Sequence, residues 1–600
     1  MKKNYRRFSL SKLFTTLAVT LALIGLCLVE PPVSARAGMV RSTRAGNQSF
    51  PAIGPALAVL PPDLPAAPAA TTLTQAATFA WKEFIALNWP AQTGKRDTAD
   101  TTKMFGDQSV PLVWQTFRAK VEIYPGNGNE KIGPHGSNKG PSQDYGYDDP
   151  PEYIYSKDSV INGSDVLPCS GQAAPNQPAW INLDEVSQIG SDSMYAGFGQ
   201  DPAPTPTNSK PNLFRYMAKA NRTEYTYVVS NQYWYTQGTD PSVSSPLQTA
   251  QNNFVKNVVN KRRIPPLGAS TVFFPASSAQ DPGTIEVKAA WRPLGPSEPA
   301  GRYHVANVRY YERDLTQKFC YREDQWALLA LHIIRKTPKA PSFIYATFEQ
   351  ADNIRDGNGA PIENPDGSVI HPPPPSPPTN PALTYTDHPK HATLTAASTT
   401  CTPGGQLYYQ NIHESNATKT PVNPGLPSGT ICVNYRDNAI PSDVIAVNKA
   451  AQVAINRYNH SAPWQYYKLV NVQWQPIPYR EINYLDPNAP YNAATYHQAN
   501  VVVETDYPLQ MFNGRFPAYG VNTNYKTNGK LYFQNVYTLH GTKVKSFDMG
   551  GCMGCHGSGA QRFGADFSFI LGSPVTAPET PDDYSLAAIA QKYKALFERH

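Results

Sequence analysis

The chain carries little charge for its length, and this excludes some partners. Asp, Glu, Lys and Arg make up only 16% of the 600 residues, and the formal net charge is +6. Residues 1–35 hold five basic side chains and one acidic one, so the remainder has a net charge of +2. The cluster Lys261-Arg262-Arg263 follows a helical pattern whose C-terminal end it can stabilise. We therefore expect no nucleic-acid partner.

Signatures of several enzyme classes are also missing. The sequence has no convincing Ser/His/Asp order, no glycine-rich loop that cradles phosphate, and no clear internal repeat. Residues 351–359 resemble a calcium loop, but Ile354 stands where such a loop needs an oxygen ligand. The sequence therefore points to none of these activities.

Proline, tyrosine and glycine are abundant, with 58, 35 and 40 residues, which favours strands and ordered loops. Aromatic and β-branched runs predict strands at 223–235, 284–294, 303–312, 325–337, 342–350, 464–476, 500–512 and 530–540. Helical spacing predicts helices at 76–89, 246–262 and 442–458, the last capped by Ser442, and a final helix from Asp582. We expect a mainly β protein with helical insertions (α+β), built on a large antiparallel sheet or sandwich.

The N-terminus has the layout of a secretory signal peptide. Basic residues precede an apolar run from Leu13 to Val29, and the small-residue sequence Val33-Ser34-Ala35 follows. An uncleaved membrane anchor is the alternative, although a helix of this length would reach about 26 Å, less than the roughly 30 Å of a bilayer core. We expect a periplasmic or otherwise extracytoplasmic protein with no integral membrane segment after cleavage.

Seven cysteines are few for this length, and one of them lies in the signal peptide. Four others are far apart in the sequence: Cys169, Cys320, Cys401 and Cys432. In an oxidising compartment they can form two disulfides, with three possible pairings. A Cys401–Cys432 bond would stabilise the fold by ~3.7 kcal/mol on a loop-entropy argument.

The last two cysteines stand in a motif with a specific chemistry. Cys552-Met553-Gly554-Cys555-His556 has the CxxCH pattern of covalent haem c attachment. Two thiols one helical turn apart can add to the two vinyl groups of the porphyrin, and the adjacent histidine can bind the iron. Cys552 and Cys555 are therefore candidate thioether sites, and His556 is the candidate proximal ligand of one haem.

Three other readings of the motif are possible. A CxxC redox pair belongs at a strand-to-helix junction of a βαβ unit, and the sequence shows no such alternation. A zinc site needs two more ligands, which no second closely spaced pair supplies. A disulfide across two residues would be strained.

The position of the motif near the C-terminus divides the chain. We expect a signal peptide at 1–35, a Pro/Ala-rich linker at 36–75 and a β-rich body at 76–540. Loop insertions in this body are expected near 125–180 and 351–400, where the sequence is rich in proline, glycine or asparagine. Residues 541–600 would form a helical haem c segment packed on the body.

No methionine follows Met553, so the distal iron ligand must come from elsewhere or be absent. The candidates upstream are Met511, His540 and His332. Each of these has an ordinary structural explanation as well, since a core methionine fills space and a buried histidine finds a hydrogen bond. Methionine, histidine and an open or water-bound position remain equally possible.

Three stretches carry a resemblance to a known group of proteins: residues 113–125, 332–353 and 550–571. They resemble those of large, exported, single-haem bacterial proteins of the cytochrome c family, for which no settled substrate can be transferred. The resemblance implies thioether bonds at Cys552 and Cys555, and His556 as proximal ligand.

The distal position would decide the function. With two protein ligands the iron can only exchange electrons, and we then expect a redox partner protein. With an open position the protein would be a haem oxidoreductase acting on a small molecule, and haem serving as a structural staple in a binding protein is a third class. We expect electron transfer, while the oligomeric state is left open.

Overall fold

The computed structural model describes residues 49–124, 146–157, 159–162, 166–169, 171, 178–185, 194–196, 213–235, 245–254, 271–294, 298–313, 319–355, 360–370, 392–394, 407–411, 429–433, 439–475, 500–502, 515–517, 526–527, 530–531, 535–539, 542–548, 552, 556, 564, 566 and 568–571. The predicted signal peptide at 1–35 and the predicted helix from Asp582 lie outside these residues.

One large sheet dominates the described part of the chain, as expected for a mainly β protein. Its strands are β1 (Arg118–Ala119), β4 (Ile181–Leu183), β6 (Arg215–Ala220), β7 (Ile285–Pro293), β8 (Val305–Arg313), β9 (Phe319–Thr337), β10 (Ala340–Gln350) and β14 (Tyr467–Gln473). Their order is β1-β6-β7-β9-β10-β14, with β8 beside β9 and β4 beside β8. The pair β4 and β8 is parallel. The sheet is therefore mixed, whereas the sequence predicted an antiparallel sheet.

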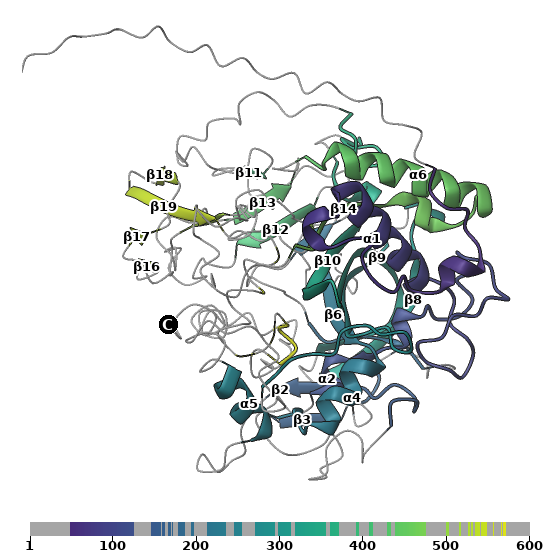
Figure 1. Cartoon of the computed structure of the whole chain (residues 1–600), viewed down its shortest axis with the longest axis vertical. Helices are drawn as coiled ribbons and strands as arrows, with labels where there is room; N and C mark the ends of the chain where they lie inside the picture. The colour runs from purple at the N-terminus through teal and green to yellow at the C-terminus, as the bar shows by residue number, and fades with distance from the viewer. Residues whose placement is uncertain are drawn as a thin grey trace, which may run out of the picture. The chain divides into compact units, whose positions relative to one another are not determined.

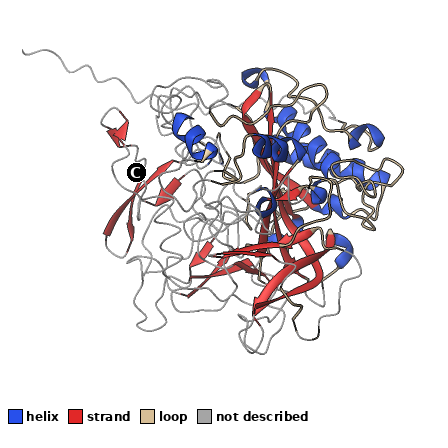
Figure 2. Ribbon diagram, turned by 90° about the horizontal axis from the view of Figure 1, so that it is seen from below, coloured by secondary structure: helices blue, strands red, loops and turns tan. Residues whose placement is uncertain are grey.

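The sheet curls almost into a barrel, so it is not a sandwich of two facing sheets (Figure 2). The strand β9 is long enough to pair with β8 through its first half and with β10 through its second half. A bridge then links the end of β4 to β6, because Tyr216 N donates to Glu185 O at 2.8 Å. This bridge makes a ring of neighbours from β6 through β7, β9, β8 and β4.

Smaller sheets account for the other described strands. One contains β11 (Ala392–Leu394), β13 (Gly429–Val433), β12 (Leu407–Asn411) and β5 (Met194–Ala196), and another contains β15 (Arg515–Pro517), β19 (Thr542–Asp548) and β18 (Asn535–Leu539). Two hairpins complete the set, β16 (Lys526–Thr527) with β17 (Lys530–Leu531), and β2 (Ile154–Lys157) with β3 (Ser159–Asn162). The region 125–180, expected as a loop insertion, thus contains the β2–β3 hairpin.

The α-helices are α1 (Leu73–Leu87), α2 (Lys120–Ile123), α4 (Arg222–Ser230), α5 (Pro246–Phe254) and α6 (Ser442–Tyr458). The helix predicted at 76–89 is α1, which begins earlier because Thr72 and Gln75 form a capping box. In Figure 1, α1 and α6 lie side by side against the sheet near β14 and β10. Trp81 Nε1 of α1 donates to Asn448 Oδ1 of α6 at 2.7 Å, which joins the two helices.

A first apolar cluster fills the space between these two helices and the sheet. Phe84 of α1 contacts Phe348 of β10 with ring centroids 4.3 Å apart, and both side chains are fully buried. Ile53, Leu57 and Leu64 belong to the same cluster. These three residues lie within the segment predicted as a linker at 36–75, so part of that segment packs on the core.

Two local predictions are also wrong. The run 223–235 was expected to be a strand, but its first part forms α4, because Asn221 caps the helix by accepting a hydrogen bond from Glu224 N. Tyr225 and Val228, three residues apart, are buried on one side of this helix. In α6 the N-cap is Pro441 without a side-chain hydrogen bond, and Ser442 is already helical.

The remaining predictions are confirmed, partly confirmed or untested. The strands predicted at 284–294, 303–312, 325–337, 342–350 and 464–476 are β7, β8, β9, β10 and β14, while the described residues 500–502 form a turn.

A disulfide joins Cys169 to Cys320, which selects one of the three pairings. Cys401 lies outside the described residues and Cys432 lies in β13. Among the helices described, none has the length and apolar character needed to cross a membrane.

Candidate functional site

The strands β7, β9 and β10 place polar side chains on the face of the sheet opposite the first apolar cluster, here called the second face. Side chains alternate along a strand. In β9, Leu331 and Ile333 point to the first cluster, whereas His332 and Ile334 point to the second face. Two cross-strand rows occupy the second face: Lys288–His332–Thr347 and Glu286–Ile334–Tyr345.

Cys552 and His556, the described residues of the CxxCH motif, lie against this second face. A second apolar cluster, which includes Ile334 and Tyr345, is in contact with Cys552 and Phe569 and contains the buried Ile570 and Leu571. We call the described residues Cys552, His556, Gly564, Asp566 and Ser568–Leu571 the C-terminal segment. Its contact with β9 and β10 brings together two of the stretches that carry the sequence resemblance.

The His556 ring contacts two aromatic rings. Its centroid is 5.0 Å from that of Tyr345 on β10 and 4.8 Å from that of Phe569 in the C-terminal segment. His556 and Cys552 are both half-buried, whereas Tyr345 is buried. Cys555, the second predicted thioether site, lies outside the described residues.

A buried ion pair attaches the C-terminal segment to β9. Lys336 Nζ donates to Asp566 Oδ2 at 2.5 Å, and Phe274 N donates to the same oxygen at 2.7 Å. Burial raises the pKa of Asp566 to about 6, although Lys336 and the Phe274 N–H act to lower it. Burial lowers the pKa of Lys336. In both groups desolvation outweighs the attraction between the charges, so this pair sets the position of the segment more than it stabilises the fold.

Helix α5 holds the same segment from another side. Gln251 Nε2 donates to the Leu571 carbonyl at 2.5 Å. Gly564 has a φ of +71°, and a Cβ atom built on it would lie 2.4 Å from the Gln251 carbonyl oxygen. Only glycine fits this close approach and this backbone conformation.

Two buried carboxyl groups lie near the segment. Burial raises the pKa of Glu286 on β7 to about 7, against a hydrogen bond from Ser568 that lowers it. Burial and the neighbouring Glu286 raise the pKa of Glu224 on α4 well above its ordinary value. Neither carboxylate oxygen of Glu224 has a hydrogen-bond partner. Glu224 therefore favours its protonated form at neutral pH, and Glu286 changes its charge in that pH range.

Of the three predicted distal ligands, His332 lies on the second face. It is buried at the centre of β9, with its Nε2 3.5 Å from Thr347 Oγ1. Burial lowers its pKa to about 3, and the charges of Lys288 and His556 contribute in the same direction. His332 is therefore a neutral imidazole within electrostatic reach of His556. Met511 and His540 lie outside the described residues.

The sequence did not single out Lys336, Asp566, Glu286 or Tyr345. A lysine within the apolar run of β9 is an unusual feature, because buried lysines need a partner. That signal was present for Lys336, but its partner is 230 residues away in the sequence, and no local pattern identifies Asp566.

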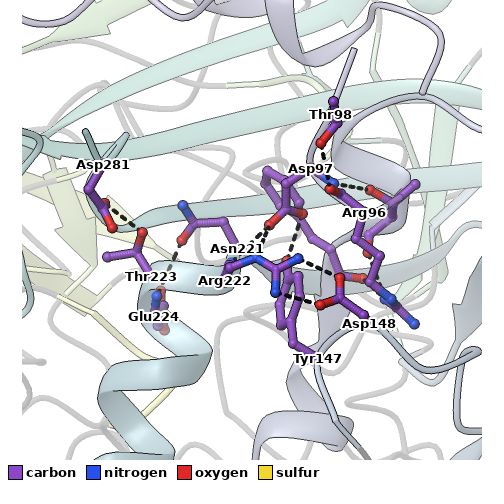
Figure 3. Close-up of polar contacts among 12 residues, drawn as sticks. Arg96, Asp97, Thr98, Tyr147, Asp148, Asn221, Arg222, Thr223, Glu224 and Asp281 are labelled. Carbon is purple, nitrogen blue, oxygen red and sulfur yellow. Dashed lines mark hydrogen bonds and ion pairs between the residues drawn. The ribbon is translucent and has the colours of Figure 1, made fainter. Parts of the chain in front are cut away.

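A separate polar cluster surrounds the start of α4 (Figure 3). Arg222 forms hydrogen bonds to both carboxylate oxygens of Asp148, at 2.8 and 2.5 Å, and its guanidinium lies over the Tyr147 ring. Tyr147 OH donates to Asp97 Oδ1 at 2.7 Å. These side chains satisfy one another and connect three separate chain segments, which indicates a structural role.

Within the described ranges, no group of three or more His, Cys, Asp or Glu side chains is arranged to hold a metal ion. Comparison with protein-family models, with curated proteins and with solved structures finds no match to this chain.

Proposed function

We propose that this chain is an exported c-type cytochrome that carries one covalently bound haem and transfers electrons. The observation that carries the proposal is the CxxCH motif, supported by the packing of its histidine. The His556 ring contacts Tyr345, a member of the second apolar cluster, and Phe569, which packs against that cluster. A histidine in an exposed surface loop would not need these aromatic contacts.

The residues present fit a haem in chemical terms. Cys552 and Cys555 would form the thioether bonds, and His556 would bind the iron. When bound, the haem would supply one-electron exchange with a redox partner protein. The chain itself contributes an apolar surface that excludes water, made of Tyr345, Phe569 and their neighbours, and water exclusion is one determinant of a haem potential.

The anchoring contacts also support this function. The Lys336–Asp566 pair and the α5 contact at Gly564 hold the segment that follows the motif against the sheet. An electron carrier benefits from a cofactor held in one place, because reorganisation around it is then small. Holding the cofactor in place is a role for a buried ion pair that adds little stability by itself.

The test is attachment of haem in a bacterial host that exports the full chain and has the c-type maturation system. We expect a periplasmic product with the intact mass of one added haem and a reducible c-type spectrum. Cys552→Ser with Cys555→Ser should remove covalent haem, whereas Cys169→Ser with Cys320→Ser, which also removes two thiols, should keep it. A colourless wild-type product without added mass would refute the proposal.

Ligand binding then separates the redox functions. A spectrum unchanged by carbon monoxide or cyanide indicates a carrier, because both axial positions are filled. Rapid binding of either ligand indicates an open distal position and favours a haem oxidoreductase.

A further inference from the structure

We infer that His332 of β9 supplies the second axial ligand of the haem iron, opposite His556. This inference rests on the proposed function. It narrows the candidates Met511, His540 and His332 to one residue.

Strand register brings His332 close to the motif. Thr347 is the direct partner of His332, and Tyr345 is two residues before Thr347 on the same face. His332 and Tyr345 are therefore diagonal cross-strand neighbours, about 7–8 Å apart in such geometry. The His556 ring contacts Tyr345, so both imidazoles converge on one part of the second face.

The surroundings of His332 on the second face are polar. Lys288 and Thr347 lie directly across from it on the two neighbouring strands. Thr347 Oγ1, which accepts a hydrogen bond from Asn500 Nδ2 at 3.1 Å, lies near Nε2 and can orient the ring.

The inferred ligand, His332, and Lys336, which binds the C-terminal segment, lie on the same strand, β9. Lys336 is four residues after His332 on β9 and therefore on the same face, roughly 13 Å along the strand. Its partner Asp566 follows His556 by ten residues in the sequence. β9 pairs with β7 on one side and with β10 on the other. This pairing gives His332 a rigid position on the second face.

The experiment compares four holoproteins by absorption and electron paramagnetic resonance: wild type, His332→Ala, His332→Met and His304→Ala. His304 is the matched control, since it is also buried with a pKa lowered by burial to about 3. It contacts Gln115 and Trp464, and Trp464 belongs to the first apolar cluster, not the second.

We expect a low-spin wild type and a low-spin His304→Ala variant. His332→Ala should become high-spin, bind carbon monoxide promptly and return to low spin when imidazole is added. His332→Met should show a sulfur-to-iron charge-transfer band in the near infrared that wild type and His332→Ala both lack, which distinguishes a ligand at position 332 from Met511. This positive signal remains informative if the alanine variant folds poorly.

Several outcomes would overturn the inference. A haem-containing wild type that is high-spin has no second protein ligand. An unchanged low-spin spectrum in both His332 variants assigns the ligand elsewhere, and substitution of Met511 and His540 then tests the other two candidates. In these cases haem is attached and the proposed function stands, whereas a wild type without haem mass refutes the proposed function itself.

Discussion

Lys336 Nζ lies 2.5 Å from Asp566 Oδ2, and both side chains are fully buried. One partner belongs to a central strand and the other to the C-terminal segment, 230 residues later. Each charge is desolvated, so each depends on the other. Removing one partner of this pair therefore leaves the other charged group buried without its counter-charge.

Asp566→Asn should destabilise the protein by about 3–5 kcal/mol, because it leaves the Lys336 ammonium buried without its counter-charge. Urea unfolding measures the loss. The double variant Lys336→Met with Asp566→Leu should lose less, since it removes both buried charges. Equal losses in the two variants would argue against an electrostatic cause.

Gly564→Ala should loosen the C-terminal segment from α5. The new Cβ would lie 2.4 Å from the Gln251 carbonyl oxygen, and φ at this position is +71°, so the cost combines a clash with about 1 kcal/mol or more of backbone strain. Faster proteolysis between residues 540 and 600 would report it. Gly301→Ala is the control, because a Cβ there meets no atom within 4 Å, and it should leave the cleavage rate unchanged.

The buried acids Glu224 and Glu286 should make stability fall as pH rises. The folded-state pKa of Glu286 is raised from 4.5 to about 7, so its contribution is complete below pH 4.5 and is lost as pH increases through 7. Glu286→Gln should flatten this part of the profile and raise the melting temperature at pH 8 relative to wild type. Thermal melts between pH 4.5 and 8 measure the effect, and parallel profiles for the two proteins would contradict it.

Removing the Cys169–Cys320 disulfide should destabilise the fold by up to about 5 kcal/mol, since it closes a loop with a sequence separation of 151. Denaturant unfolding of Cys169→Ser with Cys320→Ser measures the change. A wild-type stability in this variant would show that the bond does not constrain the unfolded chain.

The second predicted bond, Cys401–Cys432, can be tested by peptide mapping without reduction. With Cys169 and Cys320 joined to each other, this is the remaining pairing of the four separated cysteines. Free thiols at both positions would show that the protein has one structural disulfide outside the motif.

Local sequence patterns were sufficient where neighbouring residues determine the structure. The apolar and β-branched runs correctly predicted β7, β9 and β10, and helical spacing predicted α1 and α6. They failed at α4, where tyrosines and valines suggested a strand. There the Asn221 cap and the burial of one helical side were stronger than the strand propensity of the same residues.

The sequence by itself determined the mainly β character of the chain and the CxxCH motif, because both follow from residues close together in the chain. Only the tertiary structure decided that the sheet curls almost into a barrel, that Cys169 pairs with Cys320, and that His332 and Lys336 face the C-terminal segment. These features depend on strand register and on contacts between residues far apart in sequence. A one-residue change in register would turn His332 to the opposite face of the sheet, and no local pattern reports that choice.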